Sequence, residues 1–507
     1  MPSVSDYQID LDVPVQLEPS QVKTIAIIGG GASGAIIADS LLKEAPSSFS
    51  KITLFERRSK LGGVWALDEE TKKTPNNIIK SGYTNIKTDP QLKNPFHDRS
   101  NSNRFEKFII TPKSTQERFV ETPSYQGITT NIIEKMMTYS DVNQWNLPEK
   151  TPEERTYVNG LVVRDYIDAY ISKNLENERF ELIQNSTVED VERIPKSVSD
   201  ANEIPYKFRL TIRQPANEEN DVWYQEEFDS VVVATGHYHV PFIPYVKGLE
   251  ELQNKYDDVI QHAKFYRDPE VYKDKTVVVV GSRASGADLT KYIADSAVSV
   301  IQSIRNIDNT KRFSKKPNIV YKPTIVEYQL LEEGGFNIIF EDGTEVKNPD
   351  HVIYATGYQF SFSYLNRLLG EEVTKDGVVI SDLYQHTFHI NEPLITFIGV
   401  PIDGVSFRVF EYQAILASRY LAGKISLPNR REQREWADKR LSEKGFTRAY
   451  HTIGVVDSSN YLNGLIKLGE ITNTKINAGR QFPELKEEDL ALYRAAGQRL
   501  REFWDER

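Results

Sequence analysis

The residues of this 507-residue chain that are best suited to chemistry form a glycine-rich turn near its start. The apolar run 24–28 predicts a buried parallel strand, and the turn at residues 29–34 opens a helix. At this spacing Gly29 permits a tight turn, Gly31 lets the backbone approach a pyrophosphate, and Gly34 lets the helix pack closely against the strand. Because the N-terminus of a helix attracts phosphate groups, the turn predicts a dinucleotide site.

An acid and a second glycine pair follow this turn at a restrictive spacing. Residues 52–55 predict the next strand, which ends in Glu56, where a carboxylate can accept hydrogen bonds from ribose hydroxyls. A five-residue spacer then leads to Gly62-Gly63-Val64-Trp65. This pattern resembles the FAD-binding segment of the flavin-containing monooxygenases and their Baeyer–Villiger relatives, which implies that FAD binds here. The simpler alternative is an ordinary turn, but strand, glycines, helix, strand and acid occur in the required order.

A second unit of the same kind begins at the strand 276–280 and the turn 281–286. Two such units predict two dinucleotides. Arg283 stands where the middle glycine is expected, and it can contact a pyrophosphate through charge-assisted bonds. The following strand ends at Ser303 and Arg305 with no acid, so these two residues are expected to bind a 2'-phosphate and to favour NADPH over NADH. The alternative for Arg305 is an exposed arginine at a strand end.

Two Ala-Thr-Gly segments, 234–236 and 355–357, resemble the crossings at which the chain of this family leaves the FAD domain and returns to it. The predicted fold class is therefore α/β, with two Rossmann-like domains and the NADP domain inserted into the FAD domain. The expected boundaries are a disordered tail at 1–21, an FAD domain at 22–240 and 350–507 with a helical C-terminal part, and an NADP domain at 245–345. Residues 66–124 predict a long polar loop, either functional or disordered, and most of 425–507 predicts solvated helical surface.

The segment from Tyr125 to Asn131, followed by Met-Met-Thr-Tyr-Ser-Asp at 136–141, resembles the monooxygenase segment that places an asparagine against the flavin. This makes Asn131 the candidate catalytic residue, since its amide can both donate and accept hydrogen bonds and can orient NADP+ or an oxygen intermediate. The alternative is a turn asparagine or a helix N-cap. Residues 83–89 share the skeleton but end in Asp89 and lack the downstream motif, so the later copy is preferred.

The linker before the second glycine turn carries an altered form of the family's signature. His262 and Tyr266 are kept, whereas Asp258 replaces a glycine. We expect His262 to hold the linker between the domains rather than to act as an acid or base. Further along, Gln413 lies in a helix that resembles the family's closing FAD segment, and it is either a flavin-side contact or part of the core.

Together these patterns give two sets of expected contacts and no metal site. On the FAD side they are Gly29, Gly31, Ala32, Ser33, Gly34, Glu56, Arg57, Gly63, Val64, Trp65, Thr130, Asn131, Thr235, Gly236 and Gln413. On the NADP side they are Gly281, Ser282, Arg283, Ser285, Gly286, Ser303, Arg305, Thr356 and Gly357.

Composition removes several classes of protein. The net charge of -11 argues against nucleic-acid or anionic-membrane partners, and no run approaches the roughly 20 apolar residues of a spanning helix, so a soluble, cytoplasmic protein is expected. The chain has no cysteine, which excludes disulfides, thiolate metal sites and the redox-active cysteine pair of a disulfide reductase.

The resemblance implies an NADPH- and O2-dependent flavoprotein monooxygenase of the soluble microbial or fungal type, similar to N,N-dimethylaniline monooxygenase. It implies oxygenation of sulfur- or nitrogen-containing soft nucleophiles through a C4a-(hydro)peroxyflavin. Three alternatives stay open: a Baeyer–Villiger enzyme acting on ketones, an uncoupled NADPH oxidase or reductase, and a silent nucleotide-binding regulator. The Baeyer–Villiger linker usually ends in Trp followed by Pro or Asp, whereas this chain has Tyr266-Arg267. The expected partners are a small-molecule substrate and O2, with a possible homo-oligomer.

Overall fold

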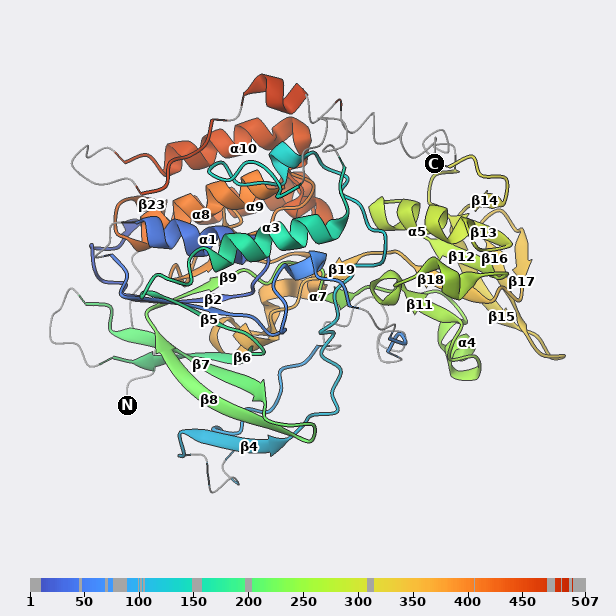
Figure 1. Ribbon diagram of the computed structural model, residues 1–507, viewed down its shortest axis with the longest axis horizontal. Coiled ribbons are helices and arrows are strands. Elements are labelled where there is room, and N and C mark those ends of the chain that lie inside the picture. The colour runs from blue at the N-terminus through green and yellow to red at the C-terminus, as the bar shows by residue number, and fades with distance from the viewer. Residues whose placement is uncertain are drawn as a thin grey trace.

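The computed structural model describes residues 11–44, 48–68, 72–75, 89–98, 100, 103, 105–147, 157–196, 203–307, 314–404, 406–471, 479–484, 486–491 and 495. In this part of the chain a mixed sheet and a parallel sheet, each covered by helices, form a larger body and a smaller inserted one (Figure 1). The carboxyl ends of the two sheets carry the two glycine turns, so the fold positions both predicted nucleotide sites.

The larger body is built on a sheet with the order β20-β21-β22-β9-β2-β3-β5 among the described residues. Its strands are β2 (Thr24–Ile28), β3 (Lys51–Phe55), β5 (Phe180–Ile183), β9 (Ser230–Val233), β20 (Leu383–Tyr384), β21 (Phe388–His389) and β22 (Ile395–Phe397). The helices that lie over one face are α1 (Ala32–Lys43), α3 (Gly160–Ser172), α8 (Phe407–Leu421), α9 (Arg430–Lys444) and α10 (Gly454–Leu468) (Figure 1). Shorter helices are α6 (Asn366–Leu369) and α7 (Lys375–Val378).

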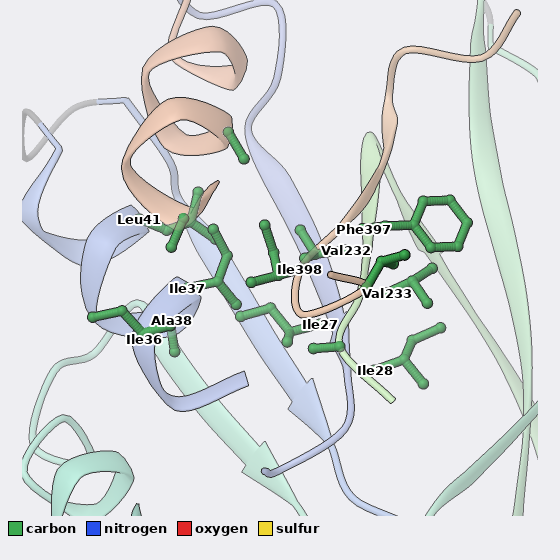
Figure 2. Packing of buried hydrophobic residues seen from close by; sticks show 14 of the residues in the cluster. Ile27, Ile28, Ile36, Ile37, Ala38, Leu41, Val232, Val233, Phe397 and Ile398 are labelled. Atoms are coloured by element: carbon green, nitrogen blue, oxygen red, sulfur yellow. The ribbon is translucent and has the colours of Figure 1, made fainter. Parts of the chain in front are cut away.

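The core between α1 and this sheet is built mainly from apolar side chains. Ile37 of α1 points toward Ile27 of β2, and both side chains are 0% exposed, as is that of Val232 on β9 (Figure 2). Because β2, β9 and α1 are locked together by this packing, the glycine turn between β2 and α1 is held on a rigid base.

An antiparallel sheet covers the other face of the larger body, with β4 (Phe108–Pro112), β6 (Thr187–Pro195), β7 (Tyr206–Pro215) and β8 (Asn220–Phe228) in the order β4-β8-β7-β6 (Figure 1). β4 comes from the segment 66–124, so part of this expected loop is a strand because it pairs with β8. Residues 1–21 were expected to be a disordered tail, but β1 (Pro14–Gln16) lies within them. This strand pairs with β23 (Ser426–Asn429), and its Val15 is buried. Residues 1–10 lie outside the described residues.

The inserted body has a parallel sheet with the order β11-β18-β12-β13-β14 among the described residues. Its elements are β11 (Ile260–His262), β12 (Thr276–Val280), β13 (Ser299–Ser303), β14 (Ile319–Lys322), β18 (His351–Tyr354), α4 (Leu249–Lys255) and α5 (Ala284–Ala294), with a small antiparallel sheet of β15 (Ile325–Leu330), β16 (Phe336–Phe340) and β17 (Glu345–Lys347). The expected boundary at residue 350 is wrong, because β18 pairs with β11 and β12. The chain therefore leaves the inserted sheet only after Tyr354.

The two crossings lie side by side. β10 (Val240–Pro241), which follows the first Ala-Thr-Gly segment, pairs antiparallel with β19 (Tyr358–Gln359), which follows the second. This pairing joins the outgoing and returning chains into one connection between the bodies. Among the described residues no helix is long and apolar enough to cross a bilayer.

Candidate active site between two nucleotide cradles

The first glycine turn has the close packing that its spacing predicts. Gly29 has a φ of +112°, and a Cβ placed there would lie 2.6 Å from the carbonyl oxygen of Ala234. A Cβ on Gly34 would lie 1.9 Å from the carbonyl oxygen of Gly29. Both distances are far below van der Waals contact, so neither position accepts a side chain. This is the geometry that brings the start of α1 directly over β2.

The start of α1 is shaped to receive an anion. Gly31 is its N-cap and no side chain caps it, so the first-turn N–H groups, including those of Ala32 and Ser33, have no partner within the helix. A Cβ on Gly31 would lie 3.4 Å from the Cα of Gly63, which places the second glycine pair opposite the first. The two backbones form a narrow cradle at the positive end of a helix dipole, and this fits a pyrophosphate.

Glu56 lies inside this cradle and is 6% exposed. One carboxylate oxygen accepts the N–H of Gly30 at 2.7 Å, and the other accepts the N–H of Arg58 at 2.9 Å. Each oxygen retains a lone pair for a ribose hydroxyl. Glu56 therefore also ties the two glycine turns together, a structural role that its position at a strand end does not reveal.

The other expected FAD-side residues surround the same cradle. Val64 and Trp65 form a short 3-10 helix with Gly63, and Trp65 packs against the start of α3, where a Cβ on Gly160 would lie 3.0 Å from its ring. Arg57 contacts the Nδ1 atom of His239 at 2.9 Å. Thr235 and Gly236, at the end of β9, are exposed beside Gly29.

Gln413 does not lie in this exposed group. It is 0% exposed, its carbonyl oxygen accepts the N–H of Gly399 at 3.0 Å, and its amide donates to the hydroxyl of Thr387 at 2.9 Å. Its burial and these hydrogen bonds fit the alternative that Gln413 is part of the core, and a flavin-side contact stays a prediction. Gln413 supports the Gly399 loop, and a Cβ on Gly399 would lie 2.1 Å from the Ser33 hydroxyl.

Asn131 is exposed, and its side chain makes no hydrogen bond with any other residue that the structure describes. It does not cap a helix: the side chain of Asn159 caps α3, and Ile133 precedes the next 3-10 turn. The neighbouring Thr130 is 0% exposed, and its hydroxyl accepts the N–H of Val158 at 3.1 Å. Thr130 is thus an anchor for Asn131 rather than the ligand contact that was expected.

The Met-Met-Thr-Tyr-Ser-Asp motif fastens the Asn131 segment to the FAD cradle. The hydroxyl of Tyr139 donates to the carbonyl oxygen of Ala32 at 2.5 Å, directly at the start of α1. Asp141 accepts from Arg480 at 2.7 Å, and this ion pair holds the pKa of Asp141 well below its usual range even though burial opposes ionisation. The sequence did not identify Arg480, which also pairs with Asp39 of α1 and Glu411 of α8.

The second glycine turn repeats the construction of the first. Gly281 has a φ of +126°, and its Cβ would lie 2.5 Å from the carbonyl oxygen of Ala355, while a Cβ on Gly286 would lie 2.4 Å from that of Gly281. Ser282, Arg283 and Ser285 are exposed at the start of α5. Gln302 donates to the carbonyl oxygen of Gly281 at 2.7 Å, a support that the spacing did not indicate.

Arg283 is the N-cap of α5, with a φ of -83°. This extended backbone suits any residue, so the departure from glycine costs no backbone strain.

Arg305 and Ser303, the two residues expected to bind a 2'-phosphate, differ in their exposure to solvent. Arg305 is exposed just after β13, and within the described part of the chain its side chain forms no hydrogen bond or ion pair. Ser303 is 3% exposed, and its hydroxyl donates to the carbonyl oxygen of Pro323 at 2.8 Å. The hydroxyl of Ser303 is thus bonded within the inserted body, and its contact with a 2'-phosphate stays a prediction.

The returning crossing is fastened by hydrogen bonds within the protein. The hydroxyl of Thr356 donates to the carbonyl oxygen of Phe242 at 2.5 Å, so it is not free for a nucleotide as expected. His262 is 0% exposed; its Nε2 atom lies 3.0 Å from the carbonyl oxygen of Gly357, and its Nδ1 atom accepts the N–H of Lys264. Burial lowers the pKa of His262 to about 3. A neutral ring with both nitrogens engaged confirms that His262 holds the linker.

Asp89, the last residue of the rejected copy, is 3% exposed and lies in a polar cluster with His239 and Ser361 at 3.2 and 2.8 Å. Burial opposes its ionisation, but His239, Arg118 and Ser361 together lower the pKa of Asp89 to about 2. Residues 83–88 lie outside the described residues, so the choice between the two copies rests on the surroundings of Asn131.

Two cradles of this construction, joined by paired crossings, define an oxidoreductase that binds two dinucleotides. The chain belongs to the flavin-binding monooxygenase-like family, whose model matches residues 113–310 and 314–494. Residues 27–99 also match an NAD(P)-binding Rossmann-like domain, and residues 225–399 match the pyridine nucleotide-disulphide oxidoreductases. The protein is therefore an FAD-dependent monooxygenase that uses NADPH, as the resemblance of its sequence motifs implied.

Similar proteins span nearly the whole chain. The flavin-containing monooxygenase ustF2 of Aspergillus flavus is 26% identical over 506 residues, covering 92% of this chain and 94% of its own. The flavin-containing monooxygenase iboF of Amanita muscaria is 26% identical and covers 84% of each chain. Among solved structures, S-allyl-L-cysteine S-oxygenase from Allium sativum matches with a TM-score of 0.68 at 23% identity and covers 96% of each chain, which shows the shared fold.

Proposed function

We propose that this enzyme oxygenates sulfur- or nitrogen-containing small molecules, with NADPH as the reductant and O2 as the oxygen source. Bound FAD would accept the hydride and activate oxygen, and the protein would bind and orient the reactants and exclude water. In this proposal the cradle of Gly31, Gly63 and Glu56 holds FAD, and the cradle of Gly281 and Gly286, together with Arg305, holds NADPH.

The single observation that carries the proposal is the state of Asn131. Its amide is exposed and makes no hydrogen bond among the described residues, while the backbone beside it is anchored through Thr130 and Tyr139. An amide with free donor and acceptor groups on a fixed segment can orient a bound nucleotide or a reacting oxygen without itself reacting. A surface asparagine with no function would not need this anchoring to the start of α1.

The linker end favours heteroatom oxygenation over Baeyer–Villiger chemistry. Tyr266 is 2% exposed and packs against Tyr125 with ring centroids 5.3 Å apart. The carbonyl oxygen of Arg267 accepts the N–H of Gln126 at 2.9 Å, which joins the linker to the segment that carries Asn131. Tyr266 and Arg267, which differ from the Baeyer–Villiger pattern, therefore contact the segment that carries Asn131. A different pair at these positions would change the shape of the candidate site.

The test is NADPH oxidation by the purified holoenzyme with and without a panel of thiols, thioethers, amines and ketones, with product and hydrogen peroxide measured together. Sulfoxides or N-oxides in proportion to the NADPH consumed would support the proposal. Esters formed from ketones would assign Baeyer–Villiger chemistry instead. Hydrogen peroxide equal to NADPH with every compound would assign an uncoupled oxidase.

A further inference from the structure

The second nucleotide cradle is already connected to the larger body by one ion pair. The Nη1 atom of Arg283, at the start of α5, lies 3.1 Å from a carboxylate oxygen of Asp403. Arg283 occupies the turn position at which a dinucleotide fold brings its backbone closest to the pyrophosphate. Its guanidinium therefore emerges at the phosphate end of the cradle, and in this structure it binds a protein carboxylate.

Asp403 is held in place by its own loop. It has a φ of +54°, a conformation that aspartate and asparagine tolerate better than most residues. The preceding Ile402 forms backbone hydrogen bonds with His451 at 2.8 Å and with Ile453 at 3.0 Å. The same loop begins at Gly399, which touches Ser33 in the FAD cradle. The carboxylate is thus fixed between the two nucleotide cradles.

The ion pair between Arg283 and Asp403 is weak enough to be broken by a bound anion. The side chains of Arg283 and Asp403 are 74% and 51% exposed, so water screens their attraction and the pair is weak. A pyrophosphate at the start of α5 offers the guanidinium several charge-assisted bonds and gains from the helix dipole as well. A carboxylate beside the same guanidinium occupies the cation that the phosphate needs.

We propose that Asp403 is an internal competitor for the nucleotide: it binds Arg283 when the second cradle is empty and gives it up to the pyrophosphate when NADPH or NADP+ binds. The ion pair then lowers the affinity of the cradle and provides an anion that recaptures Arg283 as the nucleotide leaves. This inference rests on the proposed assignment of the second glycine turn to NADPH and adds a residue of the larger body that sets its affinity.

The test is a calorimetric titration of the oxidised holoenzyme with NADP+ at low ionic strength. Asp403→Asn should lower the Kd about two- to fivefold, the range expected for loss of one exposed ion pair, and the gain should shrink as salt is added. Arg283→Ala should raise the Kd about tenfold or more. Asparagine is the chosen replacement because it tolerates the same backbone conformation.

The double variant separates competition from simple repulsion. If Asp403 acts by holding Arg283, then Asp403→Asn added to Arg283→Ala should give no further gain in affinity. An equal gain in both backgrounds, or no gain in the single variant, would overturn the proposal. Glu327→Gln is the matched control: Glu327 lies on β15, pairs with the exposed Lys247 at 2.8 Å and is itself partly exposed, and its replacement should leave the Kd unchanged.

This titration contains no organic substrate, so its result does not depend on which product the enzyme makes. An enzyme that forms only hydrogen peroxide would contradict the proposed function and leave the Asp403 result intact. A Kd that is the same for the parent protein and Arg283→Ala would instead overturn the competition, because it would show that the phosphate does not use this guanidinium.

Discussion

Gly31 and Gly34 are three residues apart in one turn, but the structure predicts opposite consequences for replacing them. A Cβ on Gly34 would lie 1.9 Å from the carbonyl oxygen of Gly29 and 3.0 Å from its carbon. α1 would have to move by more than about 1 Å away from a sheet whose facing side chains are fully buried, and overpacking of this kind costs about 1 to 3 kcal/mol or more. Alanine gains only about 1 kcal/mol of helix propensity over glycine, so Gly34→Ala should be clearly destabilising.

At Gly31 the added Cβ would lie 3.4 Å from the Cα of Gly63, which is an ordinary contact, and its φ of -89° suits any residue. Gly31→Ala should therefore fold with a loss of less than about 1 kcal/mol. The methyl group nevertheless projects into the cradle between the two glycine pairs. We expect a stable protein that binds FAD more weakly, and Gly31→Val, with a larger side chain, should be purified as apoprotein.

The assay compares the flavin-to-protein ratio with urea unfolding of the flavin-free protein. Gly464→Ala is the matched control, because Gly464 lies within α10 with nothing within 4 Å of its added Cβ, and alanine there should be neutral or slightly stabilising. If Gly34→Ala keeps its flavin and its unfolding midpoint, or if Gly31→Ala unfolds as early as Gly34→Ala, the division into packing and ligand glycines is refuted.

Three further predictions follow from single side chains. Arg305→Ala should raise the KM for NADPH about tenfold or more and leave the NADH reaction unchanged, since one charge-assisted phosphate contact is worth about 1.5 to 3 kcal/mol; equal effects on both cofactors in steady-state kinetics would contradict this. Asn131→Ala and Asn131→Asp should keep FAD and its reduction by NADPH but shift product toward hydrogen peroxide, and an unchanged product yield would remove Asn131 from the mechanism. Burial raises the pKa of Asp288, which accepts a hydrogen bond from Tyr125 at 2.8 Å, to about 7. Because the carboxyl group ionises at lower pH in the unfolded chain than in the folded protein, the folded protein loses stability as pH rises from about 4 to 7. The unfolding midpoint of Asp288→Asn should therefore vary less with pH over that window, and parallel profiles for the variant and the parent protein would refute this.

The fold was predictable because its signals are local. The steps from strand to glycine turn to helix at Gly29 and Gly281 lie within a few residues each, and the backbone restriction at each glycine is a property of that residue alone. The position of β18 was not predictable in this way. Its residues were assigned to the larger body because they precede the returning crossing, but whether a buried apolar strand joins one sheet or another depends on partners elsewhere in the chain.

Four of the expected contact residues share one feature. Ser303, Thr356, Thr130 and Gln413 are polar residues at the expected places, yet each has its side chain bonded within the protein. A hydroxyl or amide at the end of a strand can serve a ligand or a buried backbone group equally well, and burial without a partner is costly. Which of the two partners it serves is decided by atoms such as the carbonyl oxygen of Pro323, whose position no local pattern specifies.

Arg480 shows how far such a partner can lie from the motif it serves. It comes from the region expected to be solvated surface, but it is 4% exposed and contacts Asp39, Asp141 and Glu411 at 2.5, 2.7 and 2.5 Å. Lys43 and Lys173 also pair with Asp39 and Asp141, and Arg408 pairs with Glu411, so Arg480 is the cation that all three carboxylates share. Since Asp39 belongs to α1 and Asp141 ends the segment that begins at Asn131, this cluster fixes the candidate catalytic amide relative to the FAD cradle. The C-terminal region is therefore part of the scaffold of the site.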